Sequence, residues 1–341
     1  MDVLASSPPL PRRRRPPVLA AIDLGTNNCR LLIASPLKSG GFRVIDSFSR
    51  VVRLGEGLGR SGVLSAAAME RAVAALTICA ERVRRHRRYR LRAIATEACR
   101  RAANSGELLE RVKTAAGIEL DIISPDEEAR LAAVGCAPLM GRRHAGALLF
   151  DIGGGSTELI WLKAGAAEPV FATSVPLGVV GLAERFGEAD YRTILAAVMP
   201  QFAAIQRAMM ARAPFAPASH HLLGTSGTVT TLAAIALGLP RYQRGKVDAS
   251  WHDCARILAI VERLSRLDLP SRAQQACIGP ERADLVVAGC AILEAICTHW
   301  PVGRLRVADR GVREGILFDL LGTVRADRQE LASGPADRAR P

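Results

Sequence analysis

Two segments of this chain share one pattern, and this pattern restricts the possible folds more than any other feature of the sequence. The first is AIDLGTNNCRLLIA at residues 21–34, and the second is LLFDIGGGSTELIWL at residues 148–162. Each reads as an apolar strand ending in Asp, followed by glycine-containing turn residues and a second strand. A repeat of roughly 130 residues is too long for a solenoid. It indicates instead that the two halves arose by duplication.

Strand and helix patterns alternate around both segments. The stretches VLAAIDL, CRLLIAS and FRVIDSFSRVVRL predict three antiparallel strands at the start. A helix-periodic stretch after Ser65, the buried strand RLRAIAT, a helix at 104–115, the strand IELDII and a helix from Asp126 follow. The second half restarts with GALLFDI, STELIWLK and EPVFATSVPL and continues with helices. This order predicts an α/β fold.

The length of the chain predicts two lobes. With 341 residues, of which 49% are hydrophobic, the chain reaches the size at which one core usually splits into two. We expect a first lobe at 18–140, a second lobe at 141–308, and a helix at 309–323 that packs back onto the first lobe. A ligand between the lobes is the natural expectation. Residues 1–17 and 324–341 read as disordered tails.

The chain is strongly basic, with a net charge of +13 from 46 Lys and Arg against 33 Asp and Glu. This charge favours a polyanionic partner. The run ERVRRHRRYRLR at 81–92 holds seven arginines. These arginines fit the C-terminal end of a helix, where cations are favoured, or an extended basic surface that binds a long polyanion. Aromatic residues make up only 4% of the chain, which argues against a stacking surface for nucleic acid, so we expect none to bind.

The cysteines and the apolar runs predict a cytoplasmic protein without a membrane segment. The eight cysteines are scattered singly with no CxxC pair, as in proteins with reduced thiols. No uninterrupted apolar run approaches the roughly 18 residues that a membrane span requires. The basic run Arg12 to Arg15 is followed by no apolar region of the kind that a secretion signal contains.

The turn residues of the two repeated segments suit phosphate. Glycines let the backbone approach an anion, while amides and hydroxyls bind its oxygens. Asp23 and Asp151, at the strand ends, can hold a Mg²⁺. A third loop lies in HHLLGTSGTVTTLAAIA, between a strand and a helix. Tight hairpins and an ordinary strand-to-helix turn are the alternatives. The candidate phosphate-binding residues are Gly25, Thr26, Asn27, Asn28, Gly153, Gly154, Gly155, Ser156, Thr157, Gly224, Ser226 and Gly227.

The three loops resemble those of the actin-like ATPase superfamily, and further segments narrow the resemblance. These are RVVRLGEGL, RAIATEACRRAANS, DIISPDEEARLAAVG, PERADLVVAGCAILEAI and LRVADRGVREGILFDLL. Over residues 18–323, in collinear order, the chain closely resembles the exopolyphosphatase and guanosine pentaphosphate phosphohydrolase family, with DIGGGSTEL and EEARL as the family-specific signatures. The resemblance implies two actin-like (ribonuclease H-like) lobes with the active site in the cleft between them. It is closest to the short, two-domain members.

The resemblance also implies roles for individual residues. The family's catalytic base is the Glu before the small residue and Arg of the EEAR-type motif, which is Glu128 here. A carboxylate suits this role because hydrolysis needs a group that orients water and accepts its proton. The neighbouring acids fit an ordinary first helical turn. Asp151 and Glu158 match positions around the family's divalent ion, and Asp23 is the equivalent of Asp151 in the first lobe.

Two arginines match family positions that face the cleft and grip phosphate, Arg30 and Arg100, with Arg53 as a weaker candidate. A solvated surface arginine is the alternative for each. The sequence departs from the family pattern at Thr26, at Asn28-Cys29 and at Glu97. Glu97 stands where a small or neutral polar residue is usual, and its charge would lie near phosphate.

Mg²⁺-dependent hydrolysis of the terminal phosphate of polyphosphate, with Glu128 activating water, is the leading functional hypothesis. Guanosine pentaphosphate is the alternative substrate. The basic charge favours polyphosphate, since a long polyanion gains more from a distributed field. A kinase or ATPase of the same fold and a non-catalytic regulator that binds a phosphorylated nucleotide are the other classes. A homodimer is suggested only by the habit of the family.

Overall fold

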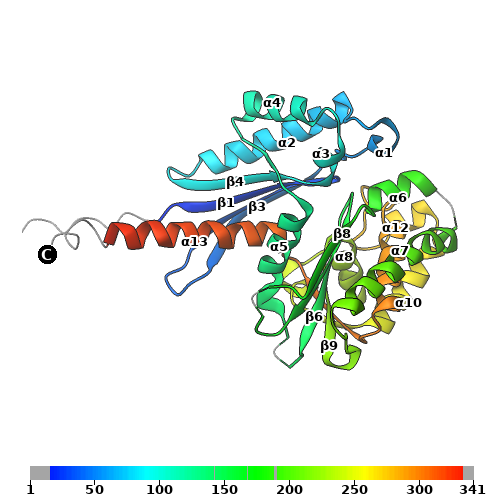
Figure 1. Cartoon of the computed structure of the whole chain (residues 1–341). Coiled ribbons are helices and arrows are strands. Elements are labelled where there is room, and N and C mark those ends of the chain that lie inside the picture. The colour runs from blue at the N-terminus through cyan, green and yellow to red at the C-terminus, as the bar shows by residue number, and fades with distance from the viewer. Residues whose placement is uncertain (1–15, 142, 167, 188–189, 333–341) are drawn as a thin grey trace, which may run out of the picture.

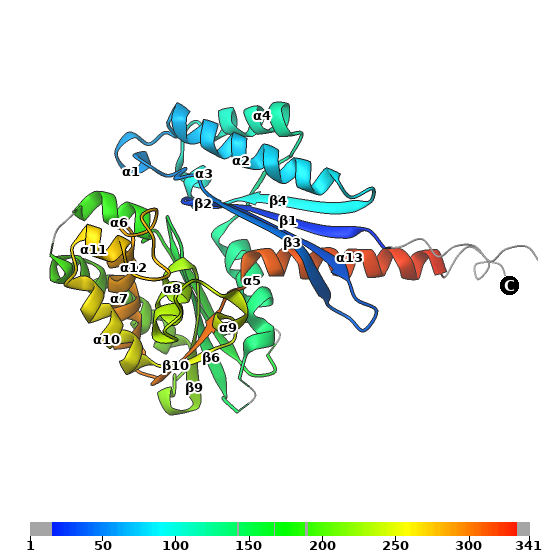
Figure 2. The same ribbon diagram turned by 180° about the vertical axis from the view of Figure 1, so that it is seen from behind.

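The computed structural model describes residues 16–141, 143–166, 168–187 and 190–332, and Figure 1 shows that they form two lobes. Figure 2 gives the view from behind, in which α13 (Val312–Ala332) again runs along the sheet of the first lobe. The tails expected at 1–17 and 324–341 fall largely outside the described residues, at 1–15 and 333–341. The two-lobed α/β architecture predicted from the sequence is confirmed.

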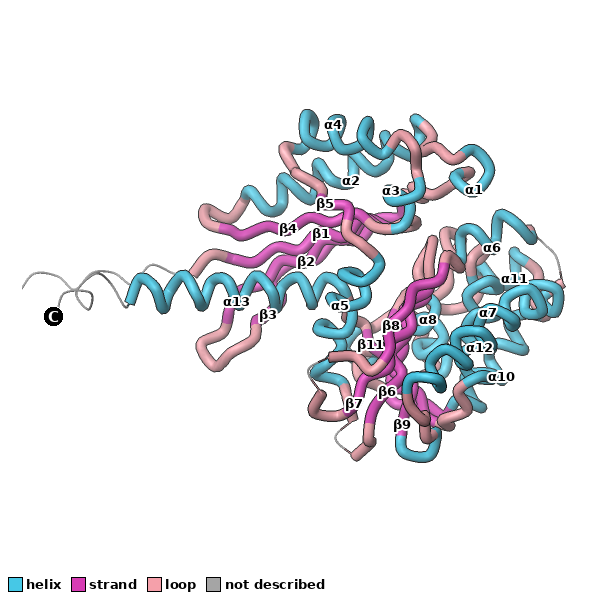
Figure 3. Tube along the Cα trace, viewed as in Figure 1, coloured by secondary structure: helices cyan, strands magenta, loops and turns pink. Residues whose placement is uncertain are grey.

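The first lobe is a five-stranded mixed sheet in the order β3-β2-β1-β4-β5. Strands β1, β2 and β3 are antiparallel, while β4 and β5 run parallel to β1. Helices α2 and α4 cover one face and α13 contacts the other (Figure 3). The elements are β1 (Val18–Leu24), β2 (Asn28–Pro36), β3 (Phe42–Val51), α1 (Leu58–Ser61), α2 (Ala66–Arg84), β4 (Tyr89–Ala95), α3 (Glu97–Arg101), α4 (Ser105–Ala116) and β5 (Asp121–Ile122).

The second lobe is a six-stranded sheet in the order β10-β11-β9-β6-β7-β8. Its antiparallel trio β6, β7 and β8, with β9 parallel to β6 and β11 parallel to β9, repeats the pairing of the first sheet. The elements are β6 (Gly146–Ile152), β7 (Thr157–Lys163), β8 (Phe171–Val175), α6 (Val179–Phe186), α7 (Tyr191–Arg212), β9 (His220–Thr225), α8 (Gly227–Ala236), α9 (Arg244–Val247), β10 (Trp251–Asp253), α10 (Cys254–Ser265), α11 (Leu269–Ala273), α12 (Val286–His299) and β11 (Arg304–Ala308).

Two helices join the lobes. Helix α5 (Pro125–Cys136) falls in the stretch we assigned to the first lobe, yet it packs against β7 and β8 of the second sheet, while α13 returns from the second lobe to cover β1. The two helices cross at unusually close range. A Cβ atom on Gly135 would lie 2.0 Å from the carbonyl oxygen of Gly311, and one on Gly315 would lie 2.1 Å from that of Leu131. The crossing therefore requires glycine on both helices.

Three expectations about the elements need correction. Helix α13 continues to Ala332, so residues 324–332 are helical where we expected a disordered tail; Val324 is buried, and no Gly or Pro follows before Gly334. The strand expected over IELDII pairs only at Asp121–Ile122, since β5 is an edge strand. Helix α5 begins at Pro125, with the Ser124 hydroxyl accepting a hydrogen bond from the amide of Glu127.

The arginine run at 81–92 is partly neutralised by acidic side chains. Helix α2 ends at Arg84, within the run. Arg82 pairs with Asp46 at 3.0 Å, and Arg92 pairs with Glu127 at 2.9 Å. These contacts favour the helix-end interpretation over a continuous basic track. All eight cysteines lie in the described residues and are free, as we expected from their scatter.

Of the described helices, only α7 is long and apolar enough to cross a membrane, with a mean hydropathy of 1.3. It contains Pro200, and one of its faces contacts α12. The buried residues recur at helical spacing, which is the pattern of a helix that covers a folded core. They are Tyr191, Ile194, Val198, Phe202, Ile205 and Met209.

Gly315→Ala tests the helix crossing. The added methyl group would overlap the backbone of α5, and we expect the free energy of unfolding to fall by about 1–3 kcal/mol. Gly322→Ala on the same helix is the matched control, because nothing lies within 4 Å of a Cβ there. It should leave stability unchanged or raise it by up to about 1 kcal/mol. Urea unfolding of both variants makes the comparison, and equal stability of the two would contradict the close crossing.

His221 makes stability depend on pH. The residue is fully buried, and neither ring nitrogen has a hydrogen-bond partner among the described residues. Burial lowers the pKa of His221 to about 4, and the charges of His144 and Arg306 act in the same direction. Between pH 6.5 and 4 the unfolded chain therefore binds more protons than the folded protein. The free energy of unfolding should decrease as the pH is lowered through this window, by on the order of 3 kcal/mol.

Urea unfolding at pH 7, 5.5 and 4.5 checks this expectation, with His221→Phe as the comparison. The variant should lose less stability on acidification than the wild type, because Phe takes up no proton. An equal loss in both proteins would mean that other groups control the acid response.

Candidate active site

The first two glycine loops are the same turn built twice. In the first lobe the Gly25 amide donates to the carbonyl of Asn28 at 2.9 Å, and in the second the Gly153 amide donates to the carbonyl of Ser156 at 2.9 Å. The strands on either side pair in the same register. The next-to-last pair before the turn is Asp23 opposite Arg30 in the first lobe. In the second lobe the same position is occupied by Asp151 opposite Glu158. The duplication thus gives corresponding positions a cation in one lobe and an acid in the other.

The two turns touch across the cleft. A Cβ atom on Gly154 would lie 3.0 Å from the Thr26 side chain, and one on Gly155 would lie 2.5 Å from the Thr26 hydroxyl. A Cβ on Gly178 would lie 2.3 Å from the Gly154 backbone. The glycines of the second turn are thus required by contacts within the protein. We had expected them mainly to let an anion approach the backbone.

The third loop turns sharply from β9 into α8. Ser226 has a φ of 108°, a left-handed conformation that a residue with a side chain seldom adopts. Its hydroxyl is buried and has no partner among the described residues. The free amides at the start of α8 and the helix dipole favour an anion in front of Ser226 and Gly227.

A cavity of about 140 Å³ lies where the three loops meet. Buried side-chain oxygens of Asn27, Asn28 and Ser226 have no hydrogen-bond partner among the described residues. Unpaired polar atoms of this kind are rare in folded proteins, and here they indicate a place for a polar ligand. The predicted site residues that line the cavity are Asp23, Gly25, Thr26, Asn27, Asn28, Arg30, Glu128, Asp151, Gly153, Gly154, Gly155, Ser156, Glu158, Ser226 and Gly227.

Four predicted residues lie outside this lining, among them the weaker candidate Arg53, which pairs with Asp284 at 2.9 Å. Gly224 is inside β9, where a Cβ would lie 2.6 Å from the Phe150 ring, so it serves packing. The Thr157 hydroxyl donates to the carbonyl of Leu177 at 2.6 Å and is buried. Arg100 lies behind Glu128 rather than in the cavity.

The carboxylates of the cavity are buried close to one another. Burial raises the pKa of Asp151 to about 7, and the charge of Glu158 adds to this rise. Burial also raises the pKa of Asp23 and of Glu158, although hydroxyls of Ser156 and Ser174 donate to Glu158 at 2.7 and 2.8 Å and oppose the rise. Mutual repulsion of buried acids is relieved by protons or by a cation.

Glu128 is held by Arg100 in the first turn of α5. The Arg100 guanidinium donates to Glu128 at 2.9 Å, to Glu97 at 2.9 Å and to the carbonyl of Ile123 at 2.9 Å. Burial nevertheless raises the pKa of Glu128 well above its usual value, helped by the charge of Glu158, and Arg100 only moderates the rise. A carboxylate tuned upward in this way accepts a proton more readily near neutral pH.

The carboxylates do not form a complete metal site by themselves. Within the described ranges, no three His, Cys, Asp or Glu side chains lie close enough together to hold a metal ion. Mg²⁺ usually takes one or two carboxylates and completes its shell with water and phosphate oxygens. Asp23 and Asp151, raised in pKa and lining the cavity, fit such a partial set.

Comparison with known proteins identifies the family. The model of the Ppx/GppA phosphatase family matches residues 33–324. Exopolyphosphatase 2 of Mycobacterium tuberculosis is 30% identical over 317 residues, which cover 89% of this chain and 98% of that protein. This chain belongs to the Ppx/GppA phosphatase family. It is accordingly a hydrolase that acts on phosphoanhydride bonds.

Solved structures of the family share the fold. The Ppx/GppA family member of Aquifex aeolicus has a TM-score of 0.74 at 26% identity and covers 92% of this chain and 99% of its own. An exopolyphosphatase from Cytophaga hutchinsonii has a TM-score of 0.80 at 24% identity, and the match covers 90% of this chain and 98% of that one. At this identity it supports the fold alone. The two lobes are therefore those of the Ppx/GppA family, with its actin-like fold.

Sequence reasoning missed two arginines at the cleft of this Ppx/GppA family member. Arg282 lines the cavity, and Arg313 lies beside it at the start of α13. Both belong to segments that carried the family resemblance, PERADL and GVREG. Each is an arginine next to an acid, a pattern that an exposed helix face also shows, so only the fold distinguishes them.

Arg100→Gln tests the positioning of Glu128. Loss of the guanidinium removes a cation that lowers the pKa of Glu128, so the acid limb of the pH profile of kcat should move to higher pH. We expect kcat at neutral pH to fall about 10–100-fold. Arg100→Lys should restore part of both effects, and the surface variant Arg111→Gln should show neither. A raised KM with an unchanged pH profile would instead indicate that Arg100 contacts substrate.

Proposed function

We propose that this protein is an exopolyphosphatase that removes the terminal phosphate of inorganic polyphosphate. The observation that supports it most directly is the position of Glu128, which lines the cavity formed by the three glycine loops. The cavity combines groups that can donate to phosphate oxygens, such as the Ser226 hydroxyl and the Arg30 guanidinium, with a buried carboxylate whose pKa is raised. Hydrolysis of a phosphoanhydride needs both features.

Glu128 would act as the general base. Water held by its carboxylate attacks the terminal phosphorus, its proton passes to Glu128, and the bridging oxygen leaves with the shortened chain. Arg100 keeps the carboxylate in one place through the 2.9 Å ion pair. Thr26 and the amides of the Gly25 and Gly153 turns hold the terminal phosphate, while Arg30 balances its charge.

A divalent cation would complete the site. Asp23 and Asp151 would hold Mg²⁺ from the ends of β1 and β6, with Glu158 behind them, and the ion would neutralise charge on the phosphate oxygens. The raised pKa values of these carboxyls support the assignment, since a bound cation relieves the repulsion that raises them. We also place the enzyme in the cytoplasm, in keeping with eight free cysteines.

Guanosine pentaphosphate is the second candidate substrate. Its terminal phosphate would occupy the same loops and leave by the same attack. Two observations favour polyphosphate: the relative from Mycobacterium tuberculosis carries the name exopolyphosphatase 2, and the chain is strongly basic with a net charge of +13. A distributed positive field benefits a long polyanion most.

Glu128→Gln tests the proposal. With Mg²⁺ present, the wild type should release orthophosphate from long-chain polyphosphate, and the variant should lose about 10²–10⁴-fold in kcat because the amide cannot accept a proton. Asp126→Asn is the matched control, since Asp126 lies in the same helical turn but is exposed. Parallel assays with guanosine pentaphosphate and ATP compare the substrates.

The outcomes separate the hypotheses. Phosphate release from polyphosphate that depends on Glu128 supports the exopolyphosphatase. Release only from guanosine pentaphosphate would make the enzyme a nucleotide phosphohydrolase, and full activity of Glu128→Gln would remove Glu128 from the mechanism. Binding of these anions without hydrolysis of any would favour a regulator.

A further inference from the structure

Glu97 lines the same cavity as Glu128, yet hydrolysis as proposed leaves its charge without a role. It is the first residue of α3, directly after β4, and its side chain is only 13% exposed. A Cβ atom on Gly155 would lie 2.9 Å from Cγ of Glu97, so the side chain packs against the second glycine turn across the cleft. A largely buried negative charge beside a phosphate site opposes binding of the anion. Its presence there therefore needs a reason.

The hydrogen bonds of Arg100 supply this reason. Nε and Nη2 of its guanidinium donate to Oε2 of Glu97 at 3.1 and 2.9 Å. Nη1 donates to Glu128 and to the carbonyl of Ile123, both at 2.9 Å. A guanidinium group has five N–H donors, all of them on these three nitrogens. The four bonds therefore leave at most one N–H group for any other ligand.

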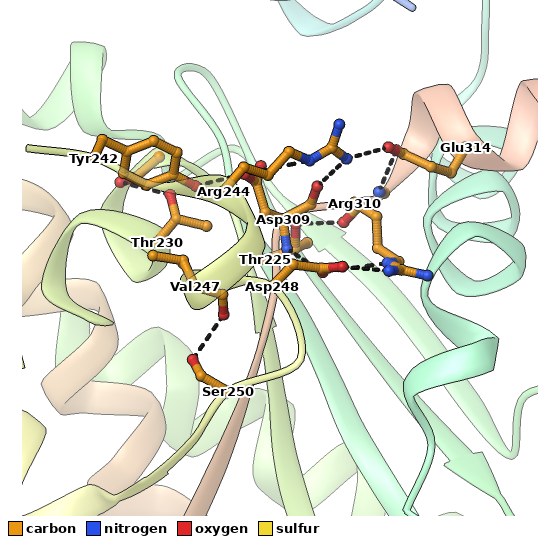
Figure 4. Close-up of polar contacts among 12 residues, drawn as sticks. Thr225, Thr230, Tyr242, Arg244, Val247, Asp248, Ser250, Asp309, Arg310 and Glu314 are labelled. Carbon is orange, nitrogen blue, oxygen red and sulfur yellow. Dashed lines mark hydrogen bonds and ion pairs between the residues drawn. The ribbon is translucent and has the colours of Figure 1, made fainter. Parts of the chain in front are cut away.

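Glu97 occupies the edge of the guanidinium group that a phosphate would use. Arginine binds carboxylate and phosphate in the same way, through two N–H groups on one edge and two oxygens. Arg310 shows this geometry in Figure 4, where Nε donates to Oδ1 of Asp248 at 3.2 Å and Nη2 donates to Oδ2. In Arg100 the same two nitrogens bind Glu97. Arg100 therefore cannot hold a phosphate by two bonds while Glu97 is in place.

The charges and the place of these bonds agree with this. Arg100 pairs with Glu97 and Glu128, each at 2.9 Å, and all three side chains are 13–14% exposed. A guanidinium group that faces two carboxylates offers little attraction to a further anion. Ile123 directly precedes Ser124, which caps α5, so the bonds from Nη1 hold the start of the helix that carries Glu128.

We infer that Glu97 is a positioning residue, which keeps the Arg100 guanidinium in the orientation that holds Glu128 and prevents it from binding the terminal phosphate. The inference rests on the proposed function, because it assumes that this phosphate lies in the cavity beside Glu128. Both glutamates line the cavity and both bind Arg100, so the guanidinium lies directly behind them. Loss of the Glu97 carboxylate would expose the guanidinium to the phosphate. Substrate would then bind more tightly and turn over more slowly.

Direct repulsion between Glu97 and the phosphate is the alternative explanation. Repulsion would weaken binding whether or not Arg100 is present. The positioning role, in contrast, acts only through Arg100. A double-mutant cycle on the two residues therefore distinguishes the explanations.

Glu97→Ala tests the inference in two backgrounds. In the wild-type background it should lower KM about 3–10-fold, because two N–H groups of Arg100 become free for phosphate. It should also lower kcat about 10-fold, because Glu128 is held less firmly. In the Arg100→Gln background it should change neither constant by more than about 2-fold. Glu107→Gln is the control and should change neither, since it removes an acid that pairs with an arginine on the exposed side of α4.

A binding measurement separates affinity from turnover. Orthophosphate, which cannot be hydrolysed further, should bind Glu97→Ala protein with Mg²⁺ about 3-fold more tightly than the wild type. Addition of Arg100→Gln should abolish this gain. Glu97→Gln keeps an acceptor oxygen for the guanidinium, so it should show smaller changes in the same direction. Thermal unfolding shows whether Glu97→Ala folds, and Glu97→Gln carries the test if it does not.

Two results would overturn the inference. An equal fall in KM in both backgrounds would assign Glu97 to direct repulsion, and unchanged constants in Glu97→Ala would leave it no role in positioning. If the wild type hydrolyses neither polyphosphate nor guanosine pentaphosphate, the proposed function fails instead. The comparison with orthophosphate still decides the role of Glu97 in that case.

Discussion

The close crossing of α5 and α13 is the contact on which the rest of the molecule depends. Gly135 and Gly315 let the two backbones approach so closely that no methyl group fits between them. Around this crossing one apolar core contains residues of both sheets, including Leu19 and Leu32 from the first and Leu149 from the second. Because α5 begins with the turn that carries Glu128, the same crossing sets the position of Glu128 relative to both glycine loops.

Burial of like charges gives the site its chemistry. Asp23, Asp151, Glu158 and Glu128 share one small space, and burial raises the pKa of each. Such a cluster is unfavourable in the empty protein and becomes favourable once cations and a polar ligand fill it. The apolar cores of both lobes therefore offset the unfavourable free energy of the buried acids. The protein is less stable than it would be without these acids, because the site is arranged for its ligand.

The sequence predicted what local patterns determine. Asp23, the Gly25 turn and their counterparts in the second lobe follow from strand and turn signals, and Glu128 follows from a motif. Contacts between distant residues could not be foreseen, because they depend on packing. Arg244 and Glu314 are separated by 70 positions, and Arg53 and Asp284 by 231. The place of Arg100 behind Glu128, and the loss of Gly224 from the lining, likewise follow from the tertiary structure alone.

The contacts opposite the helix crossing have a consequence for the opening of the cleft. Arg53 bridges the lobes by pairing with Asp284 at 2.9 Å, and the Gly57 amide donates to Glu184 at 2.8 Å. The ion pair is about one-third exposed, and pairs of this kind contribute roughly 0–1 kcal/mol. The carbonyl of Asn27 accepts the amides of Val52 and Arg53, which ties the bridge to the first glycine turn. These two contacts at the far edge of the cleft are therefore weak, and separation of the lobes there would cost little free energy.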